Sequence, residues 1–428
     1  MSRRLKVLVS AYACEPDRGS DPGIGWNLAH ELAQRHDVVV LTRANNRSAI
    51  EAALANVPDE SAPRFAYFDL PNWLLWWKRH APGGVLLYYY LWQLAAARFA
   101  RQLHAEHRFD AAHHATFVRY WSPVAVARLG VPYVIGPVGG GESAPRSVWP
   151  GIGAGGYVAE TGREAARWLA ELDPLVRPAL AAADRVLAAT EDTRARIERL
   201  GSRRIVVEGV AGLLPTEIDD VERAADAKPQ RSTFTFVSVG RLLHWKGFHL
   251  GLQAFAGLRE PSAEYWIVGS GPFQARLERM ARELGVAERV RFLGLRTRPE
   301  TLALMGECRV LVHPSLHDSG GFVCLEAMAA GLPVVCLDLG GPASMVHPGC
   351  GVAVHAGTVE QVVDDLRVAM QRMVDDPETC AAMGQAGRAW VRQHHTWDAK
   401  GERIGQILRD VAIGNDAALA ETPITAHS

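Results

Sequence analysis

The stretch from residue 313 to residue 334 reads HPSLHDSGGFVCLEAMAAGLPV and places a glycine-rich turn between two apolar runs. The first run, at 310–314, has the length and composition of a buried strand, and the turn after it leads into a helical pattern at 324–330. A second strand pattern follows at 333–337. A strand, a glycine turn, a helix and another strand in this order predict a β-α-β unit of a parallel sheet.

The same alternation fills both halves of the chain. The first half has predicted strands at 6–12, 38–43, 65–70, 110–114, 133–136, 185–190 and 205–208, with helical stretches at 25–35, 95–107 and 163–182. The second half adds strands at 234–240, 265–269 and 290–294, and helices at 248–258 and 272–284. We therefore expect an α/β fold with two Rossmann-like parallel-sheet domains facing a central cleft, because such sheets bind ligands beyond the carboxyl ends of their strands.

The domain boundaries follow from where this alternation stops. Residues 216–232 are charged and carry no strand pattern, so we predict a linker between an N-terminal domain at 1–215 and a C-terminal domain at 233–395. Residues 396–428 would form a C-terminal helix and tail. Helical spacing alone leaves open whether that helix returns to the first domain.

Composition excludes several classes of protein. The 428 residues carry 46 Lys+Arg and 47 Asp+Glu, a formal charge of −1, which argues against nucleic-acid binding. None of the six cysteines falls in a C-x-x-C pair, so a zinc module or a disulfide scaffold is disfavoured. The N-terminus has no apolar signal segment, and the run at 83–97 is short for a membrane span. A cytoplasmic location is expected.

Two cations follow the first strand of the second half, in the sequence VGRLLHWKG at 239–247. Arg241 offers a planar fork for phosphate oxygens and Lys246 a compact positive charge, and the N-terminus of the next helix also favours anions. This arrangement predicts a diphosphate clamp. The alternative is a pair of exposed surface cations.

Two carboxylates lie in the stretch quoted above. Asp318 precedes the helix and Glu326 lies within it, and carboxylates accept hydrogen bonds from the vicinal hydroxyls of sugars. The glycines between them allow a ligand to approach the backbone closely. A turn residue and a helix-surface charge are the alternative interpretations of Asp318 and Glu326.

Taken together, these motifs resemble the nucleotide-sugar half of the retaining GT-B glycosyltransferases of glycosyltransferase family 4. G-R-L-x-x-x-K-G, the turn at 269–272, Phe-Leu-Gly at 292–294 and E-A-M-A-x-G-x-P-V occur in that order over residues 234–340. The resemblance implies that Arg241 and Lys246 hold the donor diphosphate and that Glu326 binds the ribose hydroxyls. The further donor-side residues are Gly269, Gly271, Arg296, Thr297, Ser319, Gly320, Gly321 and Phe322, with Ser270 given no role.

Asp318 departs from the family pattern. Members usually carry E-x7-E, and here an aspartate, one methylene shorter, stands at the first acidic position. We expect it to act at the donor sugar and to alter the choice of sugar. The resemblance also implies retention of anomeric configuration by front-face displacement, because no nucleophile is evident.

The first half carries a glycine loop and a histidine pair. Gly19, Gly23 and Gly25 resemble the loop through which these enzymes approach the donor phosphate and the acceptor, and their spacing is not the G-x-G-x-x-G of dinucleotide binding. The family commonly shows D-x-x-H-x-H, whereas His113 and His114 are adjacent here. Neighbouring strand residues face opposite sides. We expect His114 near the reacting sugar and His113 as a second contact, the alternative being histidines bonded only to backbone.

Two further features concern the acceptor. Gly139 and Gly140, within a run of three glycines, predict a loop that lines the cleft, with a flexible surface loop as the alternative. Aromatic residues lie beside cations at 71–80 and 88–92. They suit a membrane interface or a lipid-linked acceptor, and packing against the sheet is the alternative.

The sequence thus predicts a metal-independent, retaining hexosyltransferase without a bound cofactor. Its nucleoside-diphosphate sugar would be UDP- or GDP-linked, and its acceptor a hydroxyl of a saccharide or lipid-linked molecule in bacterial polysaccharide or glycoconjugate synthesis. Peripheral contact with the inner face of the membrane is expected. The alternatives are a nucleotide-sugar epimerase, a phosphorylase-like enzyme that needs pyridoxal phosphate, and an inactive sugar-nucleotide-binding module.

Overall fold

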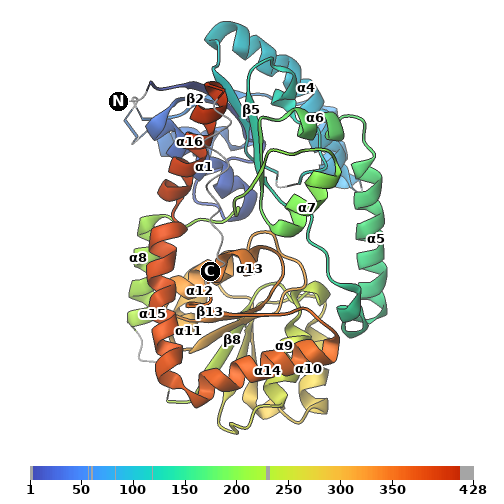
Figure 1. Cartoon of the computed structure of the whole chain (residues 1–428), viewed down its shortest axis with the longest axis vertical. Helices are drawn as coiled ribbons and strands as arrows, with labels where there is room; N and C mark the ends of the chain where they lie inside the picture. Colours follow the sequence, from blue (N-terminus) through green and yellow to red (C-terminus); the bar gives the residue numbers. More distant parts are fainter. Residues whose placement is uncertain are drawn as a thin grey trace. The chain divides into compact units, whose positions relative to one another are not determined.

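The computed structural model describes residues 3–55, 57–58, 61–81, 83–117, 119–227 and 232–414. The chain forms two compact units (Figure 1). The first unit runs from the N-terminus to Gly141, resumes at Ala166–Val210 and ends with the segment that begins at Trp397. The second unit contains Glu142–Ala165 and Ala211–Thr396.

The first unit is built on a seven-stranded parallel sheet in the order β3-β2-β1-β4-β5-β6-β7. Its strands are β1 (Lys6–Ser10), β2 (Asp37–Thr42), β3 (Arg64–Tyr67), β4 (Ala111–His114), β5 (Tyr133–Val138), β6 (Arg185–Ala188) and β7 (Ile205–Val207). Its helices are α1 (Ser20–Arg35), α2 (Arg47–Leu54), α3 (Asn72–His80), α4 (Gly84–His107), α6 (Val176–Ala182), α7 (Glu191–Arg199) and α16 (Trp397–Ala412). The sheet packs one face on α4, where Leu8, Leu41 and Ile135 meet Trp92.

The second unit has a six-stranded parallel sheet in the order β10-β9-β8-β11-β12-β13. Its strands are β8 (Thr235–Val239), β9 (Glu264–Val268), β10 (Val290–Gly294), β11 (Val310–His313), β12 (Val334–Leu337) and β13 (Gly351–Val354). Its helices are α8 (Pro215–Asp226), α9 (Phe248–Ala256), α10 (Gln274–Glu283), α11 (Arg298–Gly306), α12 (Phe322–Ala329), α13 (Gly340–Met345), α14 (Val359–Asp375) and α15 (Pro377–His394). Two such parallel sheets confirm the predicted α/β fold.

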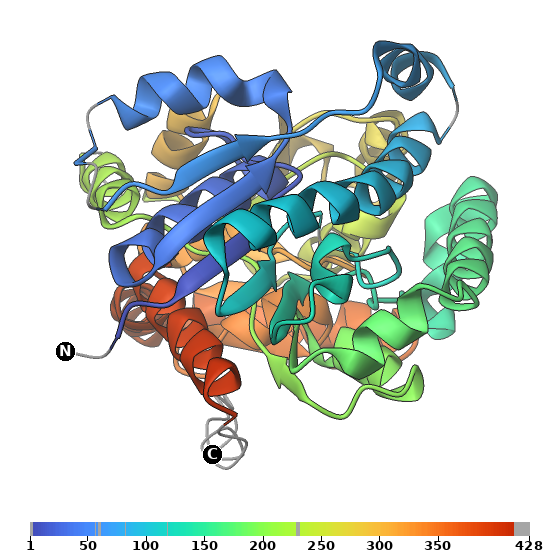
Figure 2. The ribbon, with the colours of Figure 1, turned by 90° about the horizontal axis from the view of Figure 1, so that it is seen from above.

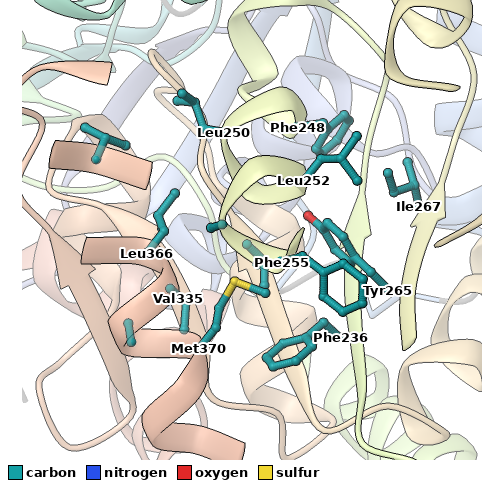
Figure 3. Close-up of a cluster of buried hydrophobic side chains, with 14 of the residues drawn as sticks. Phe236, Phe248, Leu250, Leu252, Phe255, Tyr265, Ile267, Val335, Leu366 and Met370 are labelled. Carbon is teal, nitrogen blue, oxygen red and sulfur yellow. The ribbon is translucent and has the colours of Figure 1, made fainter. Parts of the chain in front are cut away.

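Alternating residues of the second sheet enter two separate cores. Figure 3 shows one of them, in which Phe236 and Tyr265 meet Phe255 of α9 and Met370 of α14. Their strand neighbours, such as Val237, face the opposite core with α8, α11 and α12. Both faces of the strands are buried, as expected for a parallel sheet.

The C-terminal helix returns to the first unit, where α16 lies beside α1 (Figure 1). The buried Lys400 donates to Glu208, which also accepts from Arg403 at 2.9 Å. Burial raises the pKa of Glu208, but Lys400 and Arg403 outweigh burial and lower this pKa to about 2. This buried ion cluster fastens α16 to the chain after β7.

Two predicted domain boundaries differ from the structure. Part of the expected linker at 216–232 is α8, which begins with a proline at its first turn and is capped by Glu217, whose carboxylate accepts from the backbone N–H of Leu214 at 2.8 Å. Its apolar Ile218 and Val221 are buried, and its many charges hide this narrow apolar face in the sequence. Residues 228–231 lie outside the described residues.

Residues 142–165, expected in the first domain, pack in the second unit. Val148, Trp149 and Ile152 join the core that contains Phe248. The helix that follows, α5 (Gly153–Glu171), starts in the second unit and ends in the first. Among the residues that the structure describes, no helix combines the length and apolar character needed to cross a bilayer.

Candidate functional site

Three loops meet at the carboxyl edge of the second sheet. The backbone N–H of Leu242, after β8, donates to the carbonyl of Ser270, after β9, at 3.0 Å. Gly269 has a φ of 134°, and a Cβ added there would lie 1.9 Å from the carbonyl oxygen of Gly240. A Cβ at Gly271 would lie 2.5 Å from the carbonyl oxygen of Leu242. These predicted donor-side glycines therefore first serve the close packing of the loops.

Arg241 and Lys246 lie in the loop between β8 and α9 but differ in their surroundings. Arg241 is exposed, and among the described residues its guanidinium has neither a hydrogen bond nor an ion pair. Lys246 is half-buried and pairs with Asp318 at 2.5 Å, with its ammonium 4.7 Å from the centre of the Trp245 ring. The edge therefore offers one cation with its full hydrogen-bonding capacity and one that is held in place.

Asp318 is the centre of the charge arrangement after β11. It accepts from Nε2 of the buried His313 at 3.3 Å and from the backbone N–H groups of Gly320 and Gly321 at 3.1 and 3.3 Å. Burial raises the pKa of Asp318, but the bond from His313 and the charge of Lys246 outweigh burial and hold this pKa well below its ordinary value. Asp318 is thus ionised at neutral pH and fixes both Lys246 and the turn.

A residue that the sequence analysis missed links the two loops. Glu160 of α5 is buried, and its Oε1 accepts from His317 at 3.0 Å and from His244 at 3.1 Å, while its Oε2 faces Arg163 at 3.2 Å. Burial raises the pKa of Glu160, but His317, Arg163 and His244 together lower it to about 2. His317 immediately precedes Asp318, so Glu160 ties the loop of Lys246 to the loop of Asp318.

The segment before α5 supplies a second carboxylate to the same loop. Ser319 donates to Glu142 at 2.6 Å, and Arg163 donates to the backbone carbonyl of Glu142 at 2.8 Å. A Cβ added to Gly341 would lie 2.6 Å from the carbonyl oxygen of Ser319, so α13 also packs closely against the loop that contains Ser319. Phe322 then begins α12, after Gly321 at a φ of 57°.

The predicted ribose and base contacts lie around α11. Glu326 accepts from Arg298 at 2.7 Å; burial raises the pKa of Glu326, and Arg298 partly offsets this effect. The Thr297 side chain caps α11 in a reciprocal pair with Glu300, so its hydroxyl serves the helix. Arg296 is exposed, and the neighbouring Leu295 is 79% exposed, an apolar feature that the sequence analysis did not single out.

In the first unit, the glycine loop packs tightly on itself and on the chain just after β1. A Cβ at Gly23 would lie 1.9 Å from the carbonyl oxygen of Arg18, and one at Gly25 would lie 2.1 Å from that of Ala13. Gly19 is the N-cap residue of α1, with no atom within 4 Å of an added Cβ. Gly23 and Gly25 are thus required by the fold itself, and only Gly19 borders open space.

The two histidines at the end of β4 are both buried. His113 donates from Nε2 to the carbonyl of Gly136 at 2.6 Å, as the alternative interpretation expected, and His114 bonds the Tyr89 hydroxyl at 3.3 Å. Burial lowers the pKa of His113 to about 4, and burial and His113 lower that of His114 to about 3. Both rings are neutral at pH 7. The catalytic role of His114 stays a prediction.

The triple-glycine loop is held by its own unit. Gly140 has a φ of 92°, and a Cβ there would lie 2.6 Å from the ring of Trp121. Tyr120 donates from its backbone to the carbonyl of Gly139 at 3.3 Å, and Arg196 donates to the carbonyl of Gly141 at 2.8 Å. These contacts make the loop an ordered part of the carboxyl edge, next to β5.

The charges of the second sheet edge suit an anionic ligand. Within the part of the chain that the structure describes, no cluster of three or more His, Cys, Asp or Glu side chains has the geometry of a metal site. What the edge does supply is Arg241, Lys246 and the N-terminus of α12, which suit phosphate oxygens.

Two Rossmann-like units with this charge arrangement define the GT-B class of glycosyltransferases, and comparison with known proteins places the chain more closely. Residues 220–390 match the family model described as glycosyl transferases group 1, and residues 25–210 match the glycosyl transferase 4-like domain. The chain belongs to this glycosyltransferase family.

The curated relatives are similar over part of their length. A GDP-mannose-dependent monoacylated alpha-(1-6)-phosphatidylinositol monomannoside mannosyltransferase of Corynebacterium glutamicum is 31% identical over 217 residues, covering 46% of this chain and 55% of that protein. A 2-deoxystreptamine glucosyltransferase of Streptomyces kanamyceticus is 30% identical over 188 residues, 41% of this chain and 45% of that protein. The chain thus spans about half the length of these relatives.

Solved structures share the fold over almost the whole chain. Anabaena HepE in complex with UDP and glucose has a TM-score of 0.61 at 19% identity and covers 95% of this chain and 100% of its own. The lipopolysaccharide outer core galactosyltransferase WaaB has a TM-score of 0.63 at 16% identity, with the same coverage. At these identities the likeness establishes the GT-B fold.

Proposed function

We propose that the chain transfers a hexosyl group from a nucleoside-diphosphate sugar to a hydroxyl of a saccharide or lipid-linked acceptor, with retention of configuration and without a metal ion. The single observation that carries this proposal is Arg241, an exposed cation without a protein partner among the described residues, in the same loop as Lys246. Binding a diphosphate would satisfy its guanidinium, since a planar fork matches phosphate oxygens.

The leaving diphosphate sets the electrostatic demand of this reaction. The anomeric carbon–oxygen bond breaks as positive charge develops on the sugar and negative charge on the departing phosphate. Arg241, Lys246 and the free N–H groups of α12 would stabilise that negative charge, at about 3 kcal/mol for each well-placed donor. These groups replace the divalent ion that other transferases use, which is why we propose metal independence.

Asp318 controls how Lys246 takes part. Its ionised carboxylate holds the ammonium at 2.5 Å. A bound phosphate would share Lys246 with Asp318 rather than meet a freely rotating side chain, which reduces the entropy lost on binding. The other carboxylate oxygen, bonded to the N–H groups of Gly320 and Gly321, keeps the turn in shape.

Retention is proposed from the resemblance to the retaining GT-B glycosyltransferases, and a front-face route is proposed because both carboxylates of the donor motifs are already engaged. Asp318 and Glu326 are each bound to a cation. In a front-face displacement the acceptor oxygen bonds to the anomeric carbon on the side that the phosphate leaves, and the acceptor proton passes to the departing phosphate oxygen. This step needs no covalent enzyme intermediate.

The test is the stereochemistry of a single turnover. NMR of the first product formed from an α-linked donor should show the one-bond C1–H1 coupling of an α-glycoside, which separates the anomers of mannose as well as those of glucose. The coupling of a β-glycoside would exclude retention. Release of free sugar nucleotide isomers without an acceptor would instead favour an epimerase, and loss of activity on chelation that Mg²⁺ or Mn²⁺ restores would exclude metal independence.

The comparisons support two nucleotide classes for the donor. Matched relatives include a GDP-mannose-dependent enzyme, whereas a fold neighbour was solved with UDP and glucose. We therefore propose a UDP- or GDP-linked hexose and a role in glycoconjugate synthesis at the cytoplasmic side of the membrane. Competition between UDP and GDP for the wild-type chain, measured by calorimetry, distinguishes the two donors.

A further inference from the structure

The hairpin of α3 and α4 exposes an unusual amount of apolar surface. Trp73, Trp76 and Trp77 of α3 are 65%, 60% and 49% exposed, and they recur at the spacing of one helix face. Val85, Leu86 and Leu87, in the first turn of α4, are also exposed. Figure 2 shows α3 end-on beside the beginning of α4. Soluble surfaces rarely gather so many large apolar side chains without a partner.

The inner face of α3 packs on the first unit, and the outer face does not. Leu74 and Leu75 are partly buried against the core of the first unit. Lys78 also points inward, with its ammonium 5.5 and 5.1 Å from the ring centres of Tyr12 and Tyr88. These contacts anchor the helix. The three tryptophans contribute little to that core, so they are available to contact a partner outside the unit.

Charge along the hairpin selects the kind of partner. Between Asp69 and Glu106 the sequence has no Asp or Glu, whereas it has Lys78, Arg79 and two further arginines. Arg79 is exposed beside the tryptophan face. Tryptophan with basic residues is the composition of helices that lie in the interface of an anionic bilayer. A second copy of the chain would bring Arg79 against its equivalent without a carboxylate in the hairpin to pair with it.

We propose that the face formed by Trp73, Trp76, Trp77, Val85, Leu86 and Leu87, which we call the tryptophan face, docks on the surface of a bilayer containing anionic lipid. At nine residues, α3 is about 14 Å long, roughly half the thickness of the hydrocarbon core, so it would lie in the interface. This surface site goes beyond the transfer reaction and does not depend on it.

Docking there would bring the carboxyl edge of the first sheet near the lipid. Lys78 contacts Tyr12, two residues beyond the end of β1, and Arg43, just after β2, pairs with Asp69 at 2.9 Å. The base of the hairpin is therefore continuous with the edge at which an acceptor is expected. An acceptor that stays in the membrane could reach this edge without leaving the bilayer surface.

The experiment is vesicle co-sedimentation of the full chain with phosphatidylcholine vesicles, with and without phosphatidylglycerol. Wild type should bind the anionic vesicles and lose binding as salt is raised. Trp73→Ser/Trp76→Ser should lower the partition coefficient by roughly a hundredfold, about tenfold for each tryptophan. The matched control is Trp168→Ser, on α5 and 61% exposed, which should bind like wild type.

Arg79→Glu provides a second variant at an exposed position, where folding is not at risk. It should weaken binding to anionic vesicles and leave the melting temperature unchanged. The proposal is overturned if wild type does not bind anionic vesicles or binds neutral vesicles equally well. It is also overturned if the double variant binds like wild type, or if Trp168→Ser weakens binding as much as the double variant does. Self-association of wild type that the double variant abolishes would assign the tryptophan face to a second copy and also overturn it.

Discussion

Replacing Glu160 by Gln tests whether this residue of α5 holds the loops of Lys246 and Asp318 together. The substitution keeps the shape of the side chain and one acceptor oxygen, but it removes the charge that His317, His244 and Arg163 share. The new amide would also turn an N–H group toward either Arg163 or the histidines. The loops that carry Lys246 and Asp318 would then lose their common anchor.

The size of the effect follows from the pKa of Glu160. Its lowering from 4.5 to about 2 corresponds to about 3 kcal/mol of preference for the charged form in the folded chain. Screening by nearby solvent reduces the expected loss of unfolding free energy to about 2 kcal/mol. A chain of two units need not unfold in one step. The effect should therefore be measured on the unfolding transition whose midpoint temperature rises when nucleotide binds.

The assay combines thermal unfolding with calorimetry of nucleoside diphosphate binding. Glu160→Gln should lower the nucleotide-sensitive transition by about 4–8 °C and weaken nucleotide binding about tenfold. The matched control is Glu164→Gln, one turn along α5 at a more exposed position, with an expected loss below about 1 kcal/mol. Equal stability and equal nucleotide affinity of the two variants would refute the bridging role of Glu160.

Five further substitutions test other parts of the account. Lys400→Met should destabilise the first unit by about 3 kcal/mol in urea, because it removes a partner of the buried Glu208; an unchanged midpoint would contradict this. Since the pKa of Glu208 is lowered, its contribution is full above pH 4.5 and is lost as pH falls toward 2, so Glu208→Gln should flatten the acid limb of the stability profile. Asp318→Glu, which restores the family's first acidic residue, should change the KM for the donor sugar more than the affinity for free nucleotide, and equal changes in both would count against a sugar contact. Gly25→Ala should cost 2 kcal/mol or more, on the order of other overpacked sites, whereas Gly19→Ala should be nearly neutral in the same melting experiment.

The sheets could be predicted because parallel strands and covering helices impose regular apolar patterns. Among the residues that the structure describes, the strand that was missed is β13, which is only Gly351–Val354 and has a half-exposed centre, so its pattern is weak. The helix α8 was missed because charged residues dominate its composition, although Arg392 pairs with two of them, Asp219 and Glu222. Short or highly charged elements depend on tertiary contacts with residues that are distant in the sequence, so the neighbouring residues alone do not predict them.

The candidate site was predicted unevenly for the same reason. Arg241, Lys246 and Asp318 lie in local motifs, and the structure gathers all three at one sheet edge, with their catalytic roles still predictions. Glu160 bonds to His244 and His317, which lie 84 and 157 positions further along the chain, and no spacing in the sequence indicates such contacts. The glycines were expected to allow close approach, and the structure gives several of them a neighbour within the protein, as at Gly25.

The most direct test of the central claim is nucleotide binding by wild type and Arg241→Ala. Thermal shift and calorimetry with UDP, GDP, ADP and dTDP should identify one diphosphate that raises the wild-type melting temperature, with an affinity at least tenfold weaker in the variant. Since Arg241 has no protein partner among the described residues, the variant without ligand should melt like wild type. A chain that binds none of the four, or binds one equally well without Arg241, would contradict the proposed diphosphate clamp.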